Sequence, residues 1–414
     1  MVTNKEQNKL NVPHLRFPEF HGEWEKCKVS DLLDFYSTNS LSWDQLEYGT
    51  DNMLNLHYGL IHVGLPTMVD LSKDILPAIK KENEPKNFEL CKEGDIAFAD
   101  ASEDTNEVAK AIEFYTLEDK AVVCGLHTIH GRDKSNKTVV GYKGYAFSST
   151  AFHHQIRRIA QGTKIYSISA KNFAECYIGI PSKEEQTKIA KLLRLIDERI
   201  ATQSKLIEDL KKLKSAIIDY AIDSLDADFV KFGSLYETAG EGGTPTTSNA
   251  QFYENGKIPF IKIDDLKQKY LTENNDFITE LGLQKSSAWL VPTRSILFSN
   301  GATIGEISIT TYSVCTKQGI LGIVPKQNID VEFLYYFMSS SYFKKAVSRI
   351  VTEGTMKTAY LKDINNILCP IPIKEEQQEI AKMPSALNSK LDIEQSILKL
   401  FGSQKQYLLR QMFI

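Results

Sequence analysis

Histidine and cysteine, which often supply general bases, nucleophiles and metal ligands, are unevenly placed in this sequence. All eight histidines lie in the first 154 residues, and the rest of the 414-residue chain has none. The six cysteines are scattered, without a Cys-x-x-Cys pair, at Cys27, Cys91, Cys124, Cys176, Cys315 and Cys369. This spacing predicts buried reduced thiols rather than a metal centre or a redox pair.

Two further kinds of catalytic site lack support. The glycine-rich stretch 240–247 reads Gly-Glu-Gly-Gly-Thr-Pro-Thr-Thr and has no Gly-Lys-Ser/Thr ending, which an NTP-binding loop requires. The Asn/Asp-Pro-Pro-Tyr/Phe tetrapeptide, with which amino-methyltransferases of DNA bases hold the target nitrogen, does not occur in the sequence. We therefore expect a non-catalytic protein with no metal or cofactor of its own.

Composition and charge indicate an ordinary globular protein of two or three domains, with 42% hydrophobic and 25% charged residues. The chain has 49 Lys and Arg against 53 Asp and Glu, and the net charge is −4. This balance excludes a strongly basic protein that coats nucleic acid. No apolar run approaches the roughly 18 residues that span a bilayer. The start of the chain is polar, unlike a signal peptide. A cytoplasmic protein is expected.

An internal repeat is the strongest pattern in the sequence. Residues 180–190 read Ile-Pro-Ser-Lys-Glu-Glu-Gln-Thr-Lys-Ile-Ala, and eight of these eleven positions are identical in residues 371–381. At the same offset, Phe152-His-His-Gln-Ile-Arg-Arg-Ile matches Phe343-Lys-Lys-Ala-Val-Ser-Arg-Ile. Gly94-Asp-Ile-Ala-Phe also resembles Arg294-Ser-Ile-Leu-Phe. The chain thus consists of two homologous units in tandem, with divergent segments between the matched ones.

Each unit is predicted to end in a long helix. After each Lys-Glu-Glu-Gln, apolar residues recur mostly at steps of three and four, the heptad pattern of a helix that packs on another helix. We call these positions the helix-pair seam: Ile189, Leu193, Ile196, Ile200, Ile207, Leu210, Leu213 and Ile217 in the first helix, and Ile380, Leu387, Leu391, Leu398, Phe401, Leu408 and Met412 in the second. About 38 residues make a helix of roughly 57 Å.

The two helices are expected to pair with each other in antiparallel orientation, because either one alone would expose its apolar stripe. Two unrelated surface helices are the alternative, which the shared Lys-Glu-Glu-Gln start disfavours. Pro384 stands where the first helix has Leu193, and it removes a backbone hydrogen bond. We expect it to kink the second helix or to delay its regular start.

The predicted fold class is α+β, with two tandem mixed α/β domains separated by the pair of antiparallel coiled-coil helices in a pseudo-two-fold arrangement. The first domain takes residues 1–182, the central helix 183–222, the second domain 223–373 and the distal helix 374–414. Predicted strands of the second domain are 258–263, 295–298, 306–309 and 319–324, and predicted helices are 331–341 and 342–351.

With these features in place, the whole chain resembles a specificity subunit of a type I restriction–modification system. The resemblance rests on the start Leu15-Arg-Phe-Pro-Glu-Phe-His-Gly-Glu-Trp, on Gly242-Gly-Thr-Pro-Thr-Thr-Ser-Asn with Gly256-Lys-Ile-Pro-Phe-Ile-Lys, and on both Ile-Pro-x-Lys-Glu-Glu-Gln helix starts. Pro384 departs from the pattern, as does a first unit that lacks Gly-Gly-Thr-Pro.

The resemblance implies a DNA-recognition function. Each domain, called a target-recognition domain in that family, would read one half of a bipartite DNA site. The helix pair would set the spacer and dock two methyltransferase subunits, to which motor-nuclease restriction subunits are added. S-adenosylmethionine, ATP and Mg²⁺ would belong to those partners. A helix of roughly 57 Å corresponds to about 17 base pairs of duplex.

The residues that we expect to contact DNA are polar or basic and lie near glycine turns or after helices. In the first unit they are Tyr58, Asp100, His127, Arg157, Arg158 and Lys164; in the second they are Thr244, Thr246, Thr247, Asn249, Asn300, Lys317, Gln318, Thr355 and Lys357. For Gly162-Thr163-Lys164 and Gly354-Thr355-Met356-Lys357 the alternative is a glycine that caps the preceding helix. For Thr244, Thr246, Thr247 and Asn249 the alternative is ordinary turn bonding. The competing function is a coiled-coil scaffold that binds other proteins.

Overall fold

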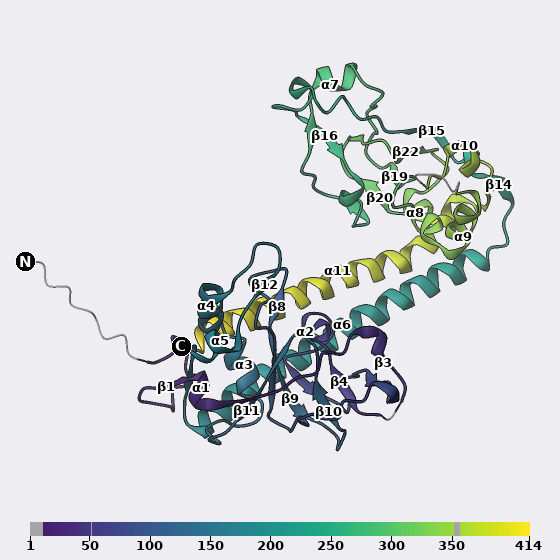
Figure 1. Ribbon diagram of the computed structural model, residues 1–414. Helices are drawn as coiled ribbons and strands as arrows, with labels where there is room; N and C mark the ends of the chain where they lie inside the picture. The colour runs from purple at the N-terminus through teal and green to yellow at the C-terminus, as the bar shows by residue number, and fades with distance from the viewer. Residues whose placement is uncertain (1–10, 51, 352–356) are drawn as a thin grey trace, which may run out of the picture. The chain divides into compact units, whose positions relative to one another are not determined.

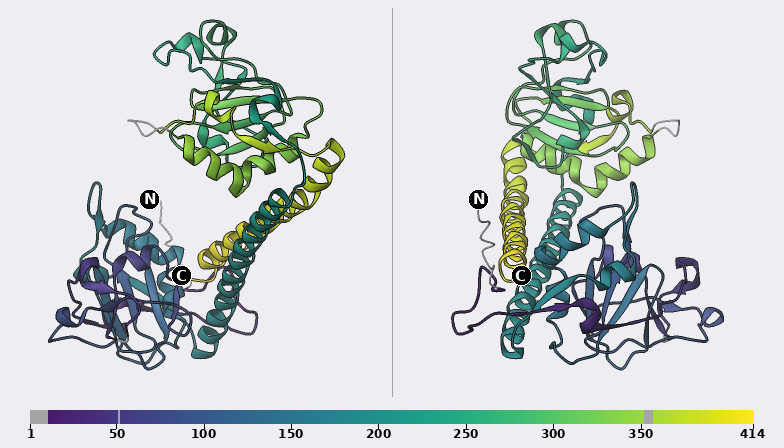
Figure 2. Two further views of the ribbon diagram at one scale, coloured as in Figure 1. Left: turned by 90° about the vertical axis from the view of Figure 1, so that its right-hand side faces the viewer. Right: turned by 60° about the vertical axis from the view of Figure 1, so that its left-hand side comes forward.

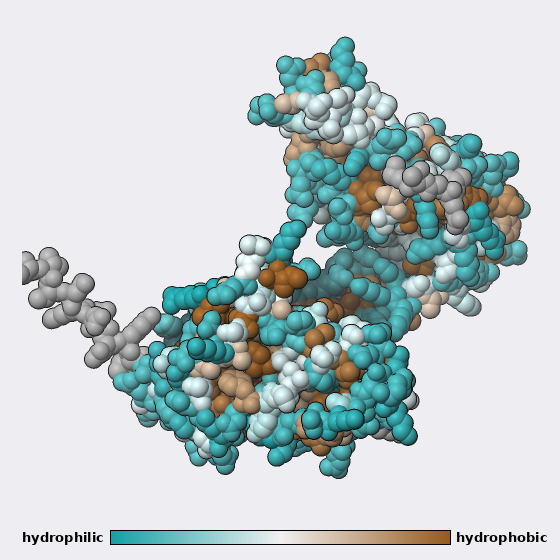
Figure 3. Space-filling model, viewed as in Figure 1, coloured by the Kyte–Doolittle hydropathy of each residue, from teal (hydrophilic) through white to brown (hydrophobic). Residues whose placement is uncertain are grey.

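The structure, a computed structural model, describes residues 11–50, 52–351 and 357–414. The chain divides into two units. The first contains the residues up to Ser204 together with Ile397–Ile414, and the second contains Lys205–Ser396. None of the helices in the described part of the chain is long and apolar enough to cross a membrane. The visible face of each unit is mostly hydrophilic, with small apolar patches (Figure 3).

A five-stranded sheet forms the centre of the first unit (Figure 1). Its strands, in order across the sheet, are β2 (Leu33–Tyr36), β11 (Thr128–Asp133), β7 (Ile96–Ala99), β9 (Ala111–Thr116) and β5 (Met68–Asp70). Only the β5–β9 pair is parallel. A second sheet has the order β10 (Val122–Cys124), β4 (Leu54–Leu56), β6 (Ala78–Ile79) and β3 (Leu46–Glu47).

Shorter elements complete the first unit. Strand β1 (Glu25–Lys28) pairs with β13 (Tyr177–Ile180), and β8 (Ala101–Ser102) pairs with β12 (Tyr166–Ser167). The helices are α1 (Val29–Leu32), α2 (Tyr58–His62), α3 (Lys143–Phe147), α4 (Thr150–Ile159) and α5 (Ala170–Ala174), with 3₁₀ turns at Trp43–Gln45 and Lys81–Asn83. Aromatic side chains such as Phe98, Phe147 and Phe173 fill the core between the sheet and these helices.

The second unit repeats this plan. Its five-stranded sheet has the order β15 (Tyr236–Glu241), β22 (Ile320–Pro325), β19 (Ile296–Ser299), β20 (Ile307–Thr310) and β17 (Tyr270–Leu271). Again only the last pair is parallel. A smaller sheet has the order β18 (Phe277–Ile278), β16 (Ile258–Ile261) and β21 (Cys315–Thr316), and β14 (Phe229–Lys231) pairs with β23 (Leu368–Pro370).

Helices α8 (Val331–Ser339), α9 (Ser341–Ile350) and α10 (Leu361–Ile364) follow the last strand of this unit's five-stranded sheet, β22. The short helix α7 (Glu280–Gln284) lies between β18 and β19, and 3₁₀ turns lie at Phe232–Ser234, Ala250–Phe252 and Ile263–Asp265. Each strand and helix predicted from the sequence in this unit is present, with ends that differ by at most two residues. Residue 341, predicted as the end of the first helix, instead begins α9. The predicted α+β fold class is confirmed.

The two long helices are α6 (Lys183–Asp223, 41 residues) and α11 (Lys374–Gln411, 38 residues). In the first unit they run antiparallel, because Asp197 of α6 binds Lys405 at 2.6 Å while Arg199, further along, lies over Phe401, four residues earlier in α11. In the second unit Lys214 Nζ donates to Asn388 Oδ1 at 3.1 Å. Figure 2 shows α6 in teal beside α11 in yellow.

The helix-pair seam is buried or half-buried at all but one of the positions named from the sequence. The exception is Leu213, which is 48% exposed. The position seven residues after Ile207 is Lys214, which is half-buried and donates from its ammonium group to Asn388. Ile218 and Ile222 then continue the buried side of α6.

Pro384 lies inside α11 and does not delay the start of the helix, so this part of the expectation is wrong, while the kink stays a prediction. The helix begins at Lys374 and continues through Pro384 to Gln411. Pro384 is buried, and its missing N–H leaves the carbonyl of Ile380 without the usual helical donor.

The glutamine of each Lys-Glu-Glu-Gln repeat fixes the preceding loop to the helix start. Gln186 Oε1 accepts from Val139 N at 2.9 Å, and its Nε2 donates to the carbonyls of Lys137 and Pro181. In the second unit Gln377 makes the same three bonds, with Asp330 N and the carbonyls of Asn328 and Pro372. Both side chains are buried. In each unit the repeated glutamine therefore pairs main-chain groups that would otherwise lack hydrogen-bond partners.

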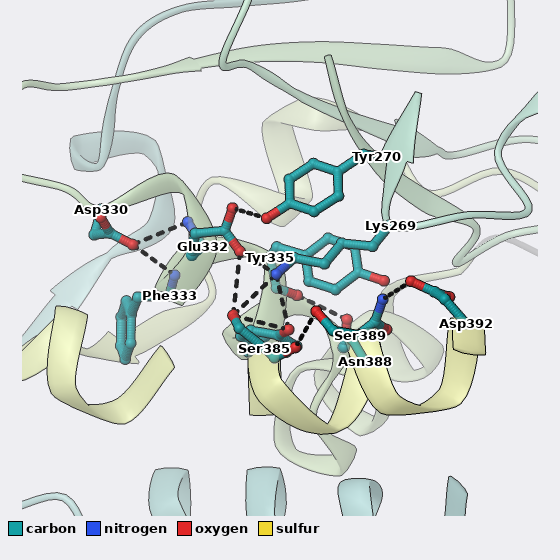
Figure 4. Close-up of polar contacts among 12 residues, drawn as sticks. Lys269, Tyr270, Asp330, Glu332, Phe333, Tyr335, Ser385, Asn388, Ser389 and Asp392 are labelled. Atoms are coloured by element: carbon teal, nitrogen blue, oxygen red, sulfur yellow. Dashed lines mark hydrogen bonds and ion pairs between the residues drawn. The ribbon is translucent and has the colours of Figure 1, made fainter. Parts of the chain in front are cut away.

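A buried lysine ties α11 to the rest of the second unit (Figure 4). Lys269, only 5% exposed, forms an ion pair with Glu332 of α8 and donates to Tyr336 Oη at 2.8 Å and to Ser385 Oγ of α11 at 3.0 Å. Its ammonium group also lies 4.6 Å from the centre of the Tyr336 ring. The charge is paired and hydrogen-bonded, which buried charges require.

Candidate nucleic-acid interface

Three of the residues expected to contact DNA in the first unit lie together. Asp100 directly follows β7, His127 lies between β10 and β11, and Tyr58 begins α2. His127 Nδ1 is 3.1 Å from Asp100 Oδ1, and the Tyr58 ring meets the His127 ring edge-on, with 5.3 Å between centres. The His127 side chain is 51% exposed. Because the Asp100 carboxylate accepts the Nδ1 proton, the neutral His127 ring keeps an acceptor at Nε2, so the group offers acceptors and an aromatic ring.

The backbone at His127 explains how this loop presents its side chain. His127 has φ = 55°, in the left-handed region that few residues other than glycine adopt. Its carbonyl accepts from Asp100 N at 3.1 Å, so the two loops hold each other. In the second unit Gly319 has φ = 91° and accepts from Asn300 N at 3.0 Å. The same two loops are thus brought together at the same end of both sheets.

Two aromatic residues of this group did not stand out in the sequence. Trp43, which is 45% exposed, lies 4.4 Å from His57 between ring centres, and His57 lies 4.7 Å from Tyr58. Burial, and then the nearby His127, lower the pKa of His57. The signal that could have shown Trp43 is a tryptophan within the polar stretch Asn39-Ser-Leu-Ser-Trp-Asp.

The loop Gly162-Thr163-Lys164 is linked to Asp100 through the strand pair β8–β12. It leads into β12, which pairs with β8 immediately after Asp100, and Ile168 N donates to Asp100 O at 3.0 Å. The helix-cap alternative is wrong, since α4 ends at Ile159 and its cap is the extended Ala160. A Cβ on Gly162 would lie 1.9 Å from the Ile165 carbonyl oxygen, so the tight turn itself requires glycine. Lys164 is exposed, as phosphate contact requires.

Arg157 and Arg158 are exposed on α4. Arg157 donates to Asn106 Oδ1 at 2.9 Å and lies 2.7 Å from His154 Nδ1. Arg158 lines a cavity with His154, Gln155 and Tyr177. Contact with phosphate would require Arg157 to exchange these partners.

In the second unit, Thr244 and Gln318 lie together. Gln318 N donates to Thr244 Oγ1 at 3.3 Å, and Gly319 N donates to Glu241 Oε1 at 2.9 Å. Lys317 is fixed through its main chain, which donates to Ile261 O at 2.9 Å. The Lys317 and Gln318 side chains are exposed and available for contact.

The other residues proposed in the second unit are placed differently. Asn300 is 1% exposed and donates to Ala359 O at 3.2 Å, a geometry that does not favour base contact. Asn249 accepts from Gln251 N at 3.1 Å, which is the turn bonding named as the alternative. Thr246, Thr247 and Lys357 are exposed, and Thr355 lies outside the described residues.

Comparison with known proteins identifies a family that matches this chain. The model of the type I restriction modification DNA specificity domain matches residues 22–212 and again residues 225–400. A Methanocaldococcus jannaschii protein, provisionally named the specificity subunit of type I restriction enzyme MjaX, is 24% identical over 412 residues, which cover 94% of this chain and 92% of the relative.

Solved structures show the same fold. The S subunit of a type I restriction–modification system from M. genitalium aligns with a TM-score of 0.54 and 18% identity, over 97% of this chain and 99% of that one. A chain from a study of complex assembly in the type I R-M system aligns with a TM-score of 0.61 and 14% identity, over 93% and 96%. The chain therefore belongs to the family of type I restriction–modification DNA specificity subunits.

Proposed function

We propose that each unit reads one half of a bipartite, asymmetric DNA site, and that α6 and α11 set the spacer between the halves and dock two methyltransferase subunits. The chain itself would be non-catalytic. S-adenosylmethionine, ATP and Mg²⁺ would be bound by the methyltransferase and motor-nuclease subunits of the complex.

The matched pair of loops carries this proposal. Both units join the loop after the third strand of the five-stranded sheet to the loop before the second, through Asp100–His127 in one unit and Asn300–Gly319 in the other. The side chains on these loops differ, with Asp100 and His127, beside Tyr58 of α2, in the first unit and Lys317 and Gln318 in the second. Since base pairs are distinguished by donor and acceptor patterns, unlike loops would read unlike half-sites.

The test is to co-express the full chain with its methyltransferase partner in a methylation-free host and to map modified adenines across the genome. We expect one split motif of two unlike half-sites around a fixed gap. The His127→Ala variant should relax one half-site, and Gln318→Ala should relax the other, because one base contact contributes about 1–3 kcal/mol of discrimination. His21→Ala, at an exposed position elsewhere in the first unit, is the control.

If the complex assembles but deposits no methylation, the scaffold function replaces the DNA-reading one. If His127→Ala and Gln318→Ala relax the same half-site, the assignment of one half to each unit is wrong.

A further inference from the structure

Three buried side chains of the first unit converge from separate segments of the chain. Cys91 precedes β7, Cys124 ends β10, and His130 lies in the middle of β11. Their exposed fractions are 5%, 2% and 0%. One potential ligand atom from each lies within 4.8 Å of the other two, and the two Sγ atoms are 3.6 Å apart.

The His130 ring is held in one orientation. Its Nε2 is 2.8 Å from Asp95 Oδ2, and Asp95 is also bound by both Nε and Nη2 of Arg132. A carboxylate bound in this way accepts the Nε2 proton and leaves a lone pair on Nδ1. His130 Nδ1 is buried and has no hydrogen-bond partner among the described residues. An unpaired acceptor in a dry core is costly, which indicates an absent partner.

We propose that Cys91 Sγ, Cys124 Sγ and His130 Nδ1 bind a zinc ion. Zn–S bonds of about 2.3 Å in tetrahedral geometry place two sulfur atoms about 3.8 Å apart, close to the observed separation. Two thiolates and a neutral imidazole balance the charge of Zn²⁺, and the two thiol protons leave to solvent. Asp95 then orients the histidine, as carboxylates do behind zinc-bound imidazoles. The set has one ligand fewer than a closed structural site.

The second unit lacks this ligand set at the matching place. There Gly322 of β22 pairs with Leu297 of β19, as His130 of β11 pairs with Ala97 of β7. A Cβ at Gly322 would lie 2.5 Å from a methyl group of Val291 and 2.8 Å from the ring of Trp289. Apolar side chains therefore fill the space that the first unit gives to cysteine and histidine.

The site would fix the loop that presents His127. Cys124 and His130 flank residues 125–129, so one ion bound by both would close this loop at its base. Cys91 lies in the segment that leads into β7, at whose end Asp100 stands. The zinc proposal does not depend on the proposed half-site function, since metal content is measured without DNA.

The test uses the full chain, expressed with zinc and purified without chelator. We expect about one zinc ion per chain in the wild-type protein by mass spectrometry of the metal. Cys91→Ser and Cys124→Ser should weaken zinc binding by more than the roughly 10–100-fold typical of losing an outer-shell partner. Cys176→Ser, which alters a buried cysteine elsewhere in the same unit, should retain the metal.

A second measurement on the wild-type chain covers the possibility that the serine variants unfold. Co²⁺ added to metal-free protein should give a thiolate-to-cobalt charge-transfer absorption that Zn²⁺ abolishes. The proposal is overturned if the wild type binds no zinc and gives no such absorption. It is also overturned if both serine variants hold zinc as tightly as the wild type, or if Cys91 and Cys124 form a disulfide and the reduced protein takes up no metal.

Discussion

The two units share their framework bonds and differ in what lies at the ends of their strands. Gln186 and Gln377 make the same three hydrogen bonds, and the five-stranded sheets have the same order. At the matched loop, however, one unit has His127 and the other has Gly319. The bonds that hold the fold are thus separate from the side chains that face solvent, so one scaffold can present two unlike recognition surfaces.

The largest expected effect comes from exchanging the residues at Leu193 of α6 and at the corresponding position of α11, Pro384. Leu193 is fully buried in α6, and Pro384 takes its place 191 residues later in α11. Leu193→Pro should destabilise the first unit by about 3 kcal/mol or more, through the lost hydrogen bond and the lost packing. Pro384→Leu should stabilise the second unit, by up to about 3 kcal/mol, because the Ile380 carbonyl regains a donor.

Hydrogen exchange measured by mass spectrometry, which follows each unit separately, is the appropriate measurement for this pair of variants. Unchanged or faster exchange in Pro384→Leu would mean that α11 is shaped around the proline and gains nothing from a leucine.

The framework glutamines should behave as equals. Gln186→Leu and Gln377→Leu each leave one N–H and two carbonyls without their partner, at about 1–3 kcal/mol for a buried group left unpaired. We expect faster hydrogen exchange at the start of the affected helix, confined to one unit in each variant. The exposed Gln378, next to Gln377, provides a control as Gln378→Leu. A large effect in only one unit would show that the two framework bonds are not equivalent.

A smaller effect is expected where the contact between α6 and α11 is an ion pair in one unit and an uncharged acceptor in the other. Asp197→Asn converts the Asp197–Lys405 ion pair of the first unit into the kind of amide–lysine contact that Asn388 and Lys214 make in the second. The ion pair is about one-fifth exposed, so we expect a loss of about 1 kcal/mol. A double-mutant cycle with Lys405→Met isolates the pairwise contribution from thermal unfolding. A coupling of zero would mean that the charge at this contact is dispensable.

The smallest effect is a difference in acid sensitivity. Burial lowers the pKa of His57 and of His153 below the ordinary value of 6.5, with further lowering from His127 and Arg157 respectively. The unfolded state therefore binds protons first as the pH falls. The stability that the neutral rings supply above pH 6.5 is lost as the pH falls through their folded-state pKa values, at about 1.4 kcal/mol for each pKa unit.

We expect hydrogen exchange to accelerate in the first unit between about pH 7 and about pH 5.5, and to change little in the second, which has no histidine. His57→Gln and His153→Gln should reduce this difference. Equal acceleration in both units would place the sensitive groups among the carboxylates instead.

The sequence predicted the framework well because repeated residues mark it. The two Lys-Glu-Glu-Gln copies located both long helices. The apolar periodicity correctly predicted every buried or half-buried seam residue that was named except Leu213, because Lys214 occupies that heptad position instead. Loop contacts were harder to predict. Asn300 lies in a small-residue turn that suggests exposure, yet its 1% exposure depends on Ala359, which is 59 residues away.

The convergence of Cys91, Cys124 and His130 had no signal in the sequence for a similar reason. Spacing rules detect ligand sets whose members recur at short, fixed intervals, whereas here only Cys124 and His130 flank one loop and Cys91 lies 33 residues before Cys124. The resemblance to a known family gave the fold and function, but not this juxtaposition.

The division of the chain has a consequence for biosynthesis. The first unit needs Ile397–Ile414 to complete its core, because Leu408, Leu409, Met412 and Phe413 pack against residues from the first half of the chain. A ribosome that adds about 5–20 residues per second takes roughly 10–40 s to make residues 205–414. Throughout that time the unit made first remains unfinished, and the unit made second is complete in sequence at Ser396, before the first one is. The order of synthesis and the order of completion are therefore reversed, and the early apolar surface must be shielded until the last turns of α11 emerge.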